Sequence, residues 1–469
     1  MTRYLIIGNS AGSIGGIEAI RQVDREGPLV VISEEPYPAY SRPQIARYLT
    51  GEVDIEKTLF RPRSFYPTRR VELLLGRAVV EINLERHVVL LNDGRELPWD
   101  KLLLATGGTP IIPPVKGLEQ IGYLTFMTLE DAQRLRERLP RMRHALIVGG
   151  GLIGLSATEA LCKLGVKTTV VELAPQILGR ALDVLAAATV QRIMENHGVH
   201  ILTSCSLAEV RSIGPSGFLA LLNNGLSLEA DTLIMAVGVK PRLELAARAG
   251  LSINRGIVVD SHMRTSQPDI YACGDAAEAY DFIAGGPRLT PIWPNAYLGG
   301  RIAGFNMAGN EITYGGGTTM NALHFFDFPI LSAGIVSADP AEGYQILTHT
   351  RNETPSDKHP SASHPLPESA VGAEEAVPGM SPHYSYKKIV LREGQVVGFL
   401  FAGDIERAGV IYGLMKNRVD VRAYAHKLLS DSFGFMSLPQ ELRHELLGTR
   451  YVSPIFNLIG ARQNAVQNQ

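Results

Sequence analysis

Residues 145–165, ALIVGGGLIGLSATEALCKLG, decide the fold class. The apolar run ALIV predicts a strand, the glycines that follow predict a tight turn, and the remainder predicts a helix. The glycines complete a GxGxxG pattern, in which Gly149 permits the turn and Gly151 lets a pyrophosphate approach the backbone. Gly154 lets the helix pack on the strand. The stretch therefore predicts a dinucleotide site at the N-terminus of a helix, where free N–H groups favour phosphate.

The next expected strand, KTTVVE (residues 167–172), ends in an acid. Glu172 follows the first glycine by about 20 residues, where a carboxylate can hold a ribose 2′-hydroxyl. Leu173, Ala174 and Pro175 supply no cation for a 2′-phosphate, which favours NAD(H) over NADP(H). The contacts expected in this unit are Gly149, Gly151, Leu152, Ile153, Gly154 and Glu172.

A similar strand–turn–helix pattern occurs earlier, in YLIIGNSAGSIGGIEAIRQV (residues 4–23). Gly8 keeps the first glycine, whereas Ser10 and Ser13 stand at the second and third positions. Serine is small enough for both roles, and the later pair Gly15-Gly16 could restore close helix packing. The repeated βα alternation predicts two parallel, doubly wound sheets.

The strand expected after this first helix is LVVISEE (residues 29–35). Glu34 supplies the ribose-binding acid of the first unit, and its neighbour Glu35 is the competing candidate.

Composition sets limits on the function. The 469 residues are enough for about three domains, and 45 Lys and Arg balance 47 Asp and Glu, so no basic field indicates a nucleic-acid binder. The cysteines, Cys162, Cys205 and Cys273, are too few and scattered for a disulfide framework, a zinc cluster or a four-cysteine iron–sulfur site. No signal peptide or membrane span is expected, and a cytoplasmic location is the default.

After about residue 320 the pattern changes to strands. ALHFFDFPILSAGIV and YKKIVLREGQVVGFLFAGD alternate, with Glu393-Gly394 expected as a hairpin turn. Residues 351–383 between them are rich in Pro, Ser and Glu and are expected to form a flexible insertion. Its histidines (His359, His364 and His383) are not expected to bind a metal, because no Cys or paired acid supports them.

Two further segments, LLLATGGTPIIPP (102–114) and TSQPDIYACGDAAE (265–278), follow the two units at the expected places. With these motifs the chain resembles the two-dinucleotide-binding-domain flavoproteins of the pyridine nucleotide–disulfide oxidoreductase superfamily, from residue 1 to about 310. The ordered motifs between and after the two glycine fingerprints are Ala105-Thr106-Gly107, Ala236-Val237-Gly238 and Ile270-Tyr271-Ala272-Cys273-Gly274-Asp275.

The resemblance implies an α/β fold with two doubly wound Rossmann-like domains and a C-terminal α+β interface domain. Residues 1–115 and 246–320 would bind FAD, and residues 116–245 would bind NAD. Residues 321–434 would form the interface domain, and the tail 435–469, with the apolar end SPIFNLIG, would either dock a partner chain or pack on its own domain.

The resemblance also assigns residues to the FAD site. Asp275 would hydrogen-bond the ribityl and phosphate region, and Pro291–Asn295 would lie against the flavin ring, with Asn295 in contact. The other cofactor contacts expected are Gly8, Ser10, Gly12, Ser13, Glu34, Arg42, Pro43, Arg47, Val79, Thr106, Gly107, Val237, Gly238 and Gly274.

The stretch AYSRPQIARYLTGE (residues 39–52) lacks the redox cysteine that disulfide-reductase branches carry there. It instead resembles ferredoxin reductases, rubredoxin reductases and nitrite-reductase-like flavoproteins. Arg42 would then steady the flavin region and its phosphates, the alternative being a solvated turn. Arg47 stands where relatives place a lysine near the flavin, which keeps the charge but changes its geometry.

The second fingerprint departs from the family at one position. Relatives often place a glutamate near the nicotinamide where this chain has Ser156. Glu159, one turn later, is either its substitute or a solvated helix residue. No residue is assigned as a general acid or base, because the flavin carries the chemistry.

These observations predict an FAD-containing, NAD(H)-dependent oxidoreductase without a redox-active disulfide. Its electrons would pass to an iron–sulfur protein or subunit, as in the flavin subunits of phenylglyoxylate dehydrogenase or tungsten aldehyde oxidoreductase complexes. The alternatives are a free NADH:rubredoxin or ferredoxin reductase, an NADH oxidase, and a non-catalytic FAD-binding redox sensor. The assembly would be a homodimer or a hetero-oligomer.

Overall fold

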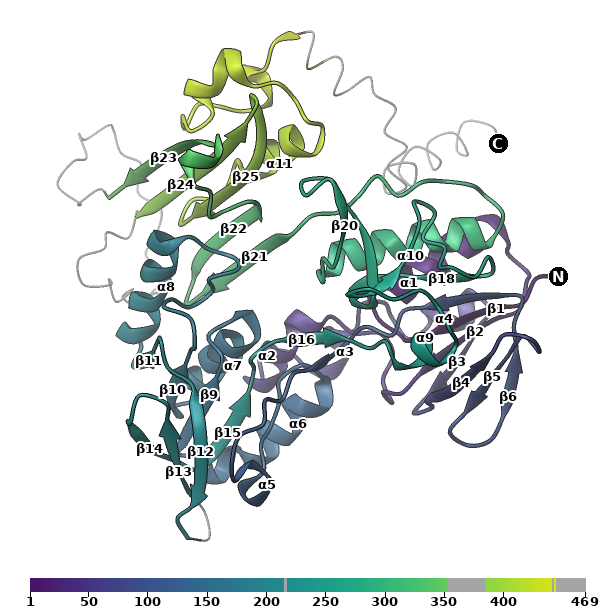
Figure 1. The fold of residues 1–469 in the computed structure, drawn as a ribbon, viewed down its shortest axis with the longest axis horizontal. Helices are drawn as coiled ribbons and strands as arrows, with labels where there is room; N and C mark the ends of the chain where they lie inside the picture. The colour runs from purple at the N-terminus through teal and green to yellow at the C-terminus, as the bar shows by residue number, and fades with distance from the viewer. Residues whose placement is uncertain (215–216, 353–383, 441–442, 444–469) are drawn as a thin grey trace, which may run out of the picture.

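The computed structural model describes residues 1–214, 217–352, 384–440 and 443. Figure 1 shows three bodies: one around α1 and α10, one around α7 and α8, and a C-terminal sheet with α11. No helix in the described part of the chain is long and apolar enough to span a membrane. The predicted α/β class with Rossmann-like parallel sheets is confirmed.

The first sheet has the strand order β18-β7-β1-β2-β3, with every pair parallel. Strands β1, β2, β7 and β18 are largely buried apolar runs, as expected for a parallel sheet covered on its faces, whereas the edge strand β3 is partly exposed. The elements are β1 (Tyr4–Ile7), α1 (Ala11–Val23), β2 (Leu29–Ser33), β3 (Val71–Leu75), β7 (Lys101–Leu104), β18 (Ile270–Ala272) and α10 (Trp293–Met307).

The second sheet, β11-β10-β9-β15, repeats this arrangement. Strand β9 corresponds to β1, β10 to β2, and β15 to β7. Its elements are β9 (His144–Val148), α7 (Leu152–Lys163), β10 (Lys167–Val171), α8 (Val184–Asn196), β11 (His200–Leu202) and β15 (Thr232–Met235). The predicted repeat of the βα unit is therefore present.

Smaller elements join these sheets. Strands β8 (Gly108–Pro110) and β16 (Val239–Pro241) pair where the chain leaves the first unit and returns to it. Further elements include η1 (Arg42–Gln44), α2 (Ile45–Leu49), α3 (Ile55–Thr58), α4 (Phe65–Thr68), β4 (Val79–Asn83), β5 (Val88–Leu91), β6 (Glu96–Pro98), α5 (Leu118–Ile121), α6 (Leu129–Arg138), β12 (Leu207–Ser212), β13 (Phe218–Leu222), β14 (Ser227–Ala230), α9 (Glu244–Arg248), β17 (Ile257–Val258), η3 (Gly274–Ala276), β19 (Ala277–Asp281) and β20 (Gly286–Arg288).

The C-terminal sheet is antiparallel, in the order β21-β22-β25-β24-β23, with α11 (Ala408–Lys416) packed on it. The expected hairpin joins β24 (Ser385–Arg392) to β25 (Gln395–Ala402), and both Glu393 and Gly394 have positive φ, as a tight hairpin turn requires. The remaining strands are β21 (Met320–Phe325), β22 (Phe328–Gly334) and β23 (Gln345–Arg351). Most of the expected insertion and of the tail lies outside the described residues.

Helices α1 and α10 cross at backbone contact, which only glycine permits. A Cβ on Gly300 would lie 1.9 Å from the carbonyl oxygen of Gly12, and a Cβ on Gly15 would lie 2.2 Å from that of Tyr297. Gly16 faces the sheet instead, since its Cβ would lie 2.9 Å from Leu103. The pair expected to permit close helix packing therefore serves two surfaces, α10 and β7.

Candidate dinucleotide-binding sites

Both glycine turns lie at the carboxyl edge of their sheets, beside the strand where the chain order reverses. In the first unit the turn leaves β1 between β2 and β7, and in the second it leaves β9 between β10 and β15. Such a switch point is where open α/β sheets bind ligands.

The first glycines of the two turns have the same conformation. Gly8 has φ 105° and Gly149 has φ 112°, which a residue with a side chain rarely adopts. A Cβ on Gly8 would lie 2.1 Å from the oxygen of Ala105, and one on Gly149 would lie 2.4 Å from that of Ala236. The Ala105 and Ala236 segments therefore press directly on the two turns, as the order of the motifs predicts.

The third positions of the two glycine fingerprints, Gly154 and Ser13, pack against the first glycine of their turns in different ways. A Cβ on Gly154 would lie 1.9 Å from the Gly149 oxygen, so only glycine fits. In the first unit, Ser13 is fully buried and its hydroxyl donates to the Gly8 oxygen at 2.6 Å. This bond explains how the imperfect fingerprint keeps the turn closed.

Both helices begin without a side-chain cap, at Ser10 and at Gly151. The N–H groups of the first turns thus have no capping partner from these residues, as expected where a phosphate binds. A Cβ on Gly151 would meet nothing within 4 Å, so the backbone is open to a ligand there. Leu152 is exposed and Ile153 half-buried on the first turn of α7.

The acid of the second unit is held in place by backbone. Glu172 follows β10 directly, and its carboxylate accepts from the N–H of Gly150 at 2.6 Å and of Ala174 at 2.8 Å. These bonds fix the carboxylate beside the glycine turn. The geometry fits the predicted ribose role.

The first unit offers two acids with different surroundings. Glu35 accepts from Tyr40 Oη at 2.5 Å and from Arg42 at 2.7 Å, so both of its oxygens are engaged. Glu34 directly follows β2, as Glu172 follows β10, and pairs through one oxygen with Arg242 at 2.6 Å. The position of Glu34 after β2, which matches that of Glu172 after β10, favours Glu34 for the ribose.

Asp275 lies in η3, at the carboxyl end of β18. Burial raises the pKa of its carboxyl group, and Arg42 acts in the opposite direction. No hydrogen bond to the Asp275 carboxylate is present among the described residues. A half-buried acceptor without a protein donor fits a ligand hydroxyl, as the FAD assignment requires.

The other predicted FAD contacts surround the same edge. Arg42 binds Glu35 and the oxygen of Met127, which fixes it between the first unit and α6, and Pro43 beside it is exposed. Arg47 is exposed and pairs with Glu52 at 3.0 Å. Asn295, in the first turn of α10, donates to the oxygen of Thr318 at 3.1 Å.

The remaining predicted positions are backbone turns or strand ends. Thr106, Gly107, Val237 and Gly238 follow β7 and β15, and Gly12 and Gly274 lie where α1, η3 and α10 converge. Val79 is buried at the start of β4, just after Arg77 donates to the oxygen of Ser33. Their direct contacts with cofactor stay predictions.

Glu159 is not a solvated helix residue. It is 9% exposed, and its carboxylate accepts from the N–H of Phe326 at 3.0 Å and from Lys163 at 2.8 Å. Phe326 belongs to the β21–β22 turn and stacks on His197 at 3.7 Å. Glu159 therefore joins α7 to the C-terminal domain. Ser156 is half-buried on the same helix. A role beside the nicotinamide stays a prediction for both residues.

Sequence reasoning missed three residues that shape the first site. Tyr66 donates to the side chain of Asn9 at 2.9 Å, which holds the glycine turn from outside, and Tyr40 Oη accepts from the N–H of Leu129 at 3.0 Å. Arg242, which pairs with Glu34, is the third. None belongs to a glycine fingerprint, although Tyr40 lies in the stretch 39–52 and Arg242 follows the Ala236-Val237-Gly238 motif.

Cys162, Cys205 and Cys273 are free thiols, and burial affects the pKa of each. Burial raises the pKa of Cys273 to about 12, and its sulfur lies against Gly12, behind the first glycine turn. Burial also raises the pKa of Cys162 and of Cys205. A thiol must ionise to act as a nucleophile, so a raised pKa lowers the fraction of reactive thiolate at neutral pH.

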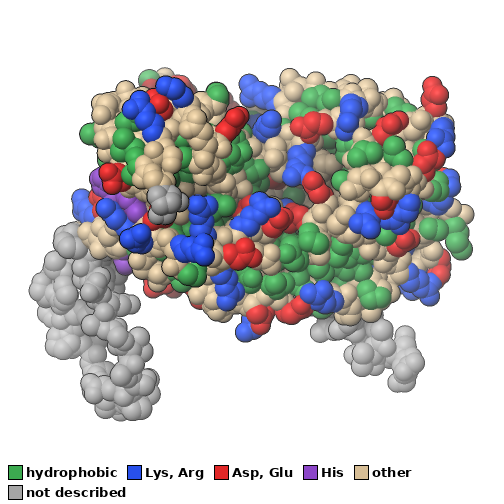
Figure 2. All heavy atoms as spheres, turned by 90° about the horizontal axis from the view of Figure 1, so that it is seen from below, with side chains coloured by type: hydrophobic (Ala, Val, Ile, Leu, Met, Phe, Trp, Pro, Cys, Tyr) green, Lys and Arg blue, Asp and Glu red, His purple; other side chains and the backbone are tan. Residues whose placement is uncertain are grey.

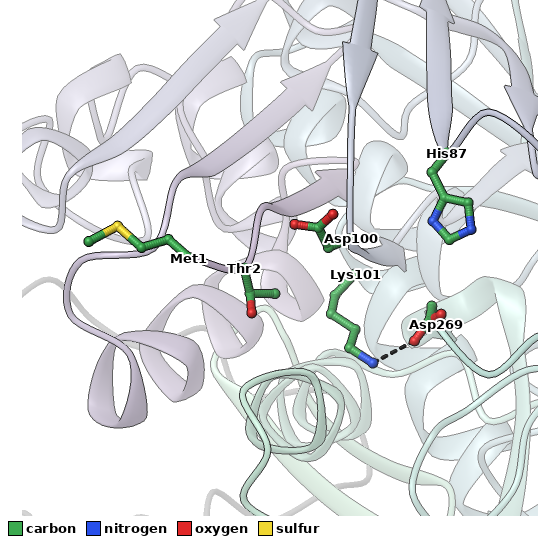
Figure 3. A pocket seen from close by; sticks show the side chains of 6 residues that line it. All are labelled: Met1, Thr2, His87, Asp100, Lys101 and Asp269. Carbon is green, nitrogen blue, oxygen red and sulfur yellow. Dashed lines mark hydrogen bonds and ion pairs between the residues drawn. The ribbon is translucent and has the colours of Figure 1, made fainter.

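Neither the surface charge in Figure 2 nor the cavity in Figure 3 indicates a competing site. Figure 2 shows basic and acidic side chains interspersed on one face, without a field of one sign. The cavity in Figure 3, lined by Met1, Thr2, His87, Asp100, Lys101 and Asp269, lies at the amino ends of β1, β7 and β18. That is opposite to the edge where such sheets bind ligands.

The described residues contain no cluster suited to a metal, and the three histidines of the insertion lie outside them.

Two Rossmann-like sheets, each with a glycine turn and an acid at its switch point, define a flavoprotein with two dinucleotide sites. The model of the "Pyridine nucleotide-disulphide oxidoreductase" family matches residues 2–300. The chain belongs to this family, whose members bind FAD and NAD(H), so it is an oxidoreductase and both predicted cofactors are supported.

Several known proteins are similar over most of the chain. The epsilon subunit of the NADH-dependent phenylglyoxylate dehydrogenase of Aromatoleum evansii is 32% identical over 75% of this chain and 83% of its own length. The rubredoxin-NAD(+) reductase of Pseudomonas putida is 32% identical over 66% and 80%. The chain spans only 48% of the nitrite reductase of Bacillus subtilis, at 28% identity over 89% of this chain. Among solved structures, a NAD-dependent persulfide reductase from A. fulgidus has a TM-score of 0.76 and 27% identity, over 88% of this chain and 76% of that one.

Proposed function

We propose that the protein is an FAD-dependent NAD(H):acceptor oxidoreductase that exchanges hydride with NAD(H) and single electrons with an iron–sulfur protein or subunit. The observation that carries this proposal is the sequence of residues 39–52, where disulfide-reducing relatives would carry a redox cysteine. Residues 39–52 contain no cysteine, and the pKa of each of the three thiols elsewhere is raised. Electrons would then leave the flavin without a protein disulfide.

When bound, FAD accepts a hydride and can release two electrons singly. The chain supplies binding and orientation. The open helix N-termini at Ser10 and Gly151 would hold the pyrophosphates, and Asp275 would accept from the ribityl chain. Glu172, with its carboxylate fixed by Gly150, would hold the ribose of NAD.

We further propose that the chain is the NAD-side flavin subunit of a multisubunit dehydrogenase. Its similarity to the phenylglyoxylate dehydrogenase subunit, over most of both chains, supports this choice. The predicted cytoplasmic location belongs to the same proposal. Anaerobic affinity purification from the native cell, followed by mass spectrometry, tests it. Stoichiometric iron–sulfur subunits are expected, and a chain recovered alone or only with itself would contradict the subunit role.

The second candidate is a free reductase of rubredoxin or ferredoxin, which the similarity to rubredoxin-NAD(+) reductase favours. Anaerobic stopped-flow with NADH and each carrier distinguishes the readings. Fast transfer to a small carrier by the isolated chain supports this candidate. Faster transfer to oxygen than to either carrier would support an NADH oxidase, and a flavin that NADH does not bleach would indicate a sensor.

A further inference from the structure

Arg242 lies at the first dinucleotide site although it comes from the end of the second unit. It directly follows β16, where the chain returns from that unit, and its guanidinium Nη1 lies 2.6 Å from Oε2 of Glu34. The two residues are 208 positions apart in the sequence.

The main chain of Arg242 is anchored to a predicted FAD motif. Its N–H donates to the oxygen of Gly107 at 3.0 Å, and its own carbonyl oxygen accepts from Thr106 Oγ1 at 3.1 Å. Gly107 has φ 66°, so the motif turns sharply at this point. These two hydrogen bonds hold the backbone of Arg242 in place, and so restrict where its side chain can lie.

The pairing leaves Glu34 able to bind a ligand. Arg242 engages one carboxylate oxygen, and no described residue donates to the other. The neighbouring Glu35 differs, because the side chains of Tyr40 and Arg42 bind its two oxygens. Arg242 is 43% exposed, and a planar guanidinium is a surface on which purines stack.

We propose that Arg242 and Glu34 together hold the adenosine half of FAD, with Arg242 fixing the carboxylate for the ribose and contacting the adenine. An exposed ion pair contributes little to the stability of a fold. If the pair were purely structural, its removal would change neither the free energy of unfolding nor FAD binding by much. The pair lies beside the Thr106–Gly107 motif, which contacts the glycine turn at Gly8, so it adjoins the FAD site of the proposed function, on which this inference rests.

Flavin binding by the apoprotein tests the proposal. The dissociation constants of FAD and of FMN, which lacks the adenosine, are measured by fluorescence quenching for wild type, Arg242→Ala and Arg242→Lys. The control is Arg248→Ala, an exposed arginine on α9 with no partner among the described residues. We expect FAD binding to weaken about tenfold in Arg242→Ala and less in Arg242→Lys, with FMN binding and the control unchanged. Unchanged FAD binding, or equal weakening for FAD and FMN, would overturn the proposal.

A double-mutant cycle supplies an independent readout. If the two residues act together, Glu34→Gln and Arg242→Ala should each weaken FAD, and their combination should weaken it by less than the product of the two effects. Glu35→Gln combined with Arg242→Ala should instead be additive. Additivity for Glu34, or coupling only to Glu35, would refute the assigned pair.

Discussion

Replacing Gly300 by alanine should separate α1 from α10 and damage the first dinucleotide site. The added Cβ would lie 1.9 Å from the Gly12 oxygen, whereas real Cβ atoms essentially never approach closer than 3.0 Å. The obstructing atom is backbone, so no side-chain rotation relieves the clash. The helices must move apart by more than about 1 Å, in a close-packed interior that tolerates little expansion.

The expected cost follows from two opposing effects. Overpacking of this kind costs typically about 1–3 kcal/mol, and more where backbone must move. Alanine in place of a helical glycine recovers up to about 1 kcal/mol. We expect a net loss of about 2 kcal/mol in the free energy of unfolding. FAD binding should also weaken, because Gly12 lies in the first turn of α1, directly after the glycine turn.

Gly299 supplies the matched control on the same helix. A Cβ there would lie 3.2 Å from the flexible end of Met263, so Gly299→Ala should be neutral or slightly stabilising. Urea denaturation followed by flavin fluorescence, with the FAD content of the purified proteins, compares the two variants. Equal stability and equal FAD content in Gly300→Ala and Gly299→Ala would refute the reasoning.

Three further predictions concern single side chains. In the apoprotein, Asp275 has a raised pKa in the folded state, so its contribution to stability is complete below the ordinary pKa of about 3.9 and is lost as pH rises through the raised value. Asp275→Asn should remove this pH dependence and weaken FAD binding, and an unchanged pH–stability profile would count against it. Leu173→Arg, at a 70% exposed position beside Glu172, should improve binding of NADPH relative to NADH; an unchanged ratio of dissociation constants would place the ribose elsewhere. Lys388→Met should destabilise the protein by about 3 kcal/mol in denaturant, because it leaves Asp183 buried without its ion-pair partner at 2.9 Å, and a loss below about 1 kcal/mol would be inconsistent with that pairing.

Local patterns predict the parts of this fold that depend on local geometry. The spacing of Gly149, Gly151 and Gly154 indicates a strand, turn and helix, because each glycine is required by a backbone conformation or close approach that involves only a few neighbouring residues. The same logic finds the first unit, although Ser13 replaces a glycine. Only the structure shows why it can, through its bond to the Gly8 oxygen.

Contacts between distant segments could not be predicted in this way. Nothing near Glu159 indicates that its partner is the N–H of Phe326 in another domain. The ion pair between Arg242 and Glu34 likewise depends on how the chain returns through β16. Such contacts arise from tertiary packing, which periodicity and motif spacing do not encode.

The central claim is that electrons leave the flavin without a protein disulfide, and an anaerobic titration of the purified holoprotein with NADH tests it most directly. FAD stores two electrons, so full reduction should require about one equivalent of NADH per FAD, and the end point should not change in a variant with Cys162, Cys205 and Cys273 all replaced by serine. An end point of about two equivalents that falls to one in the cysteine-free variant would reveal a redox-active thiol pair and contradict the account.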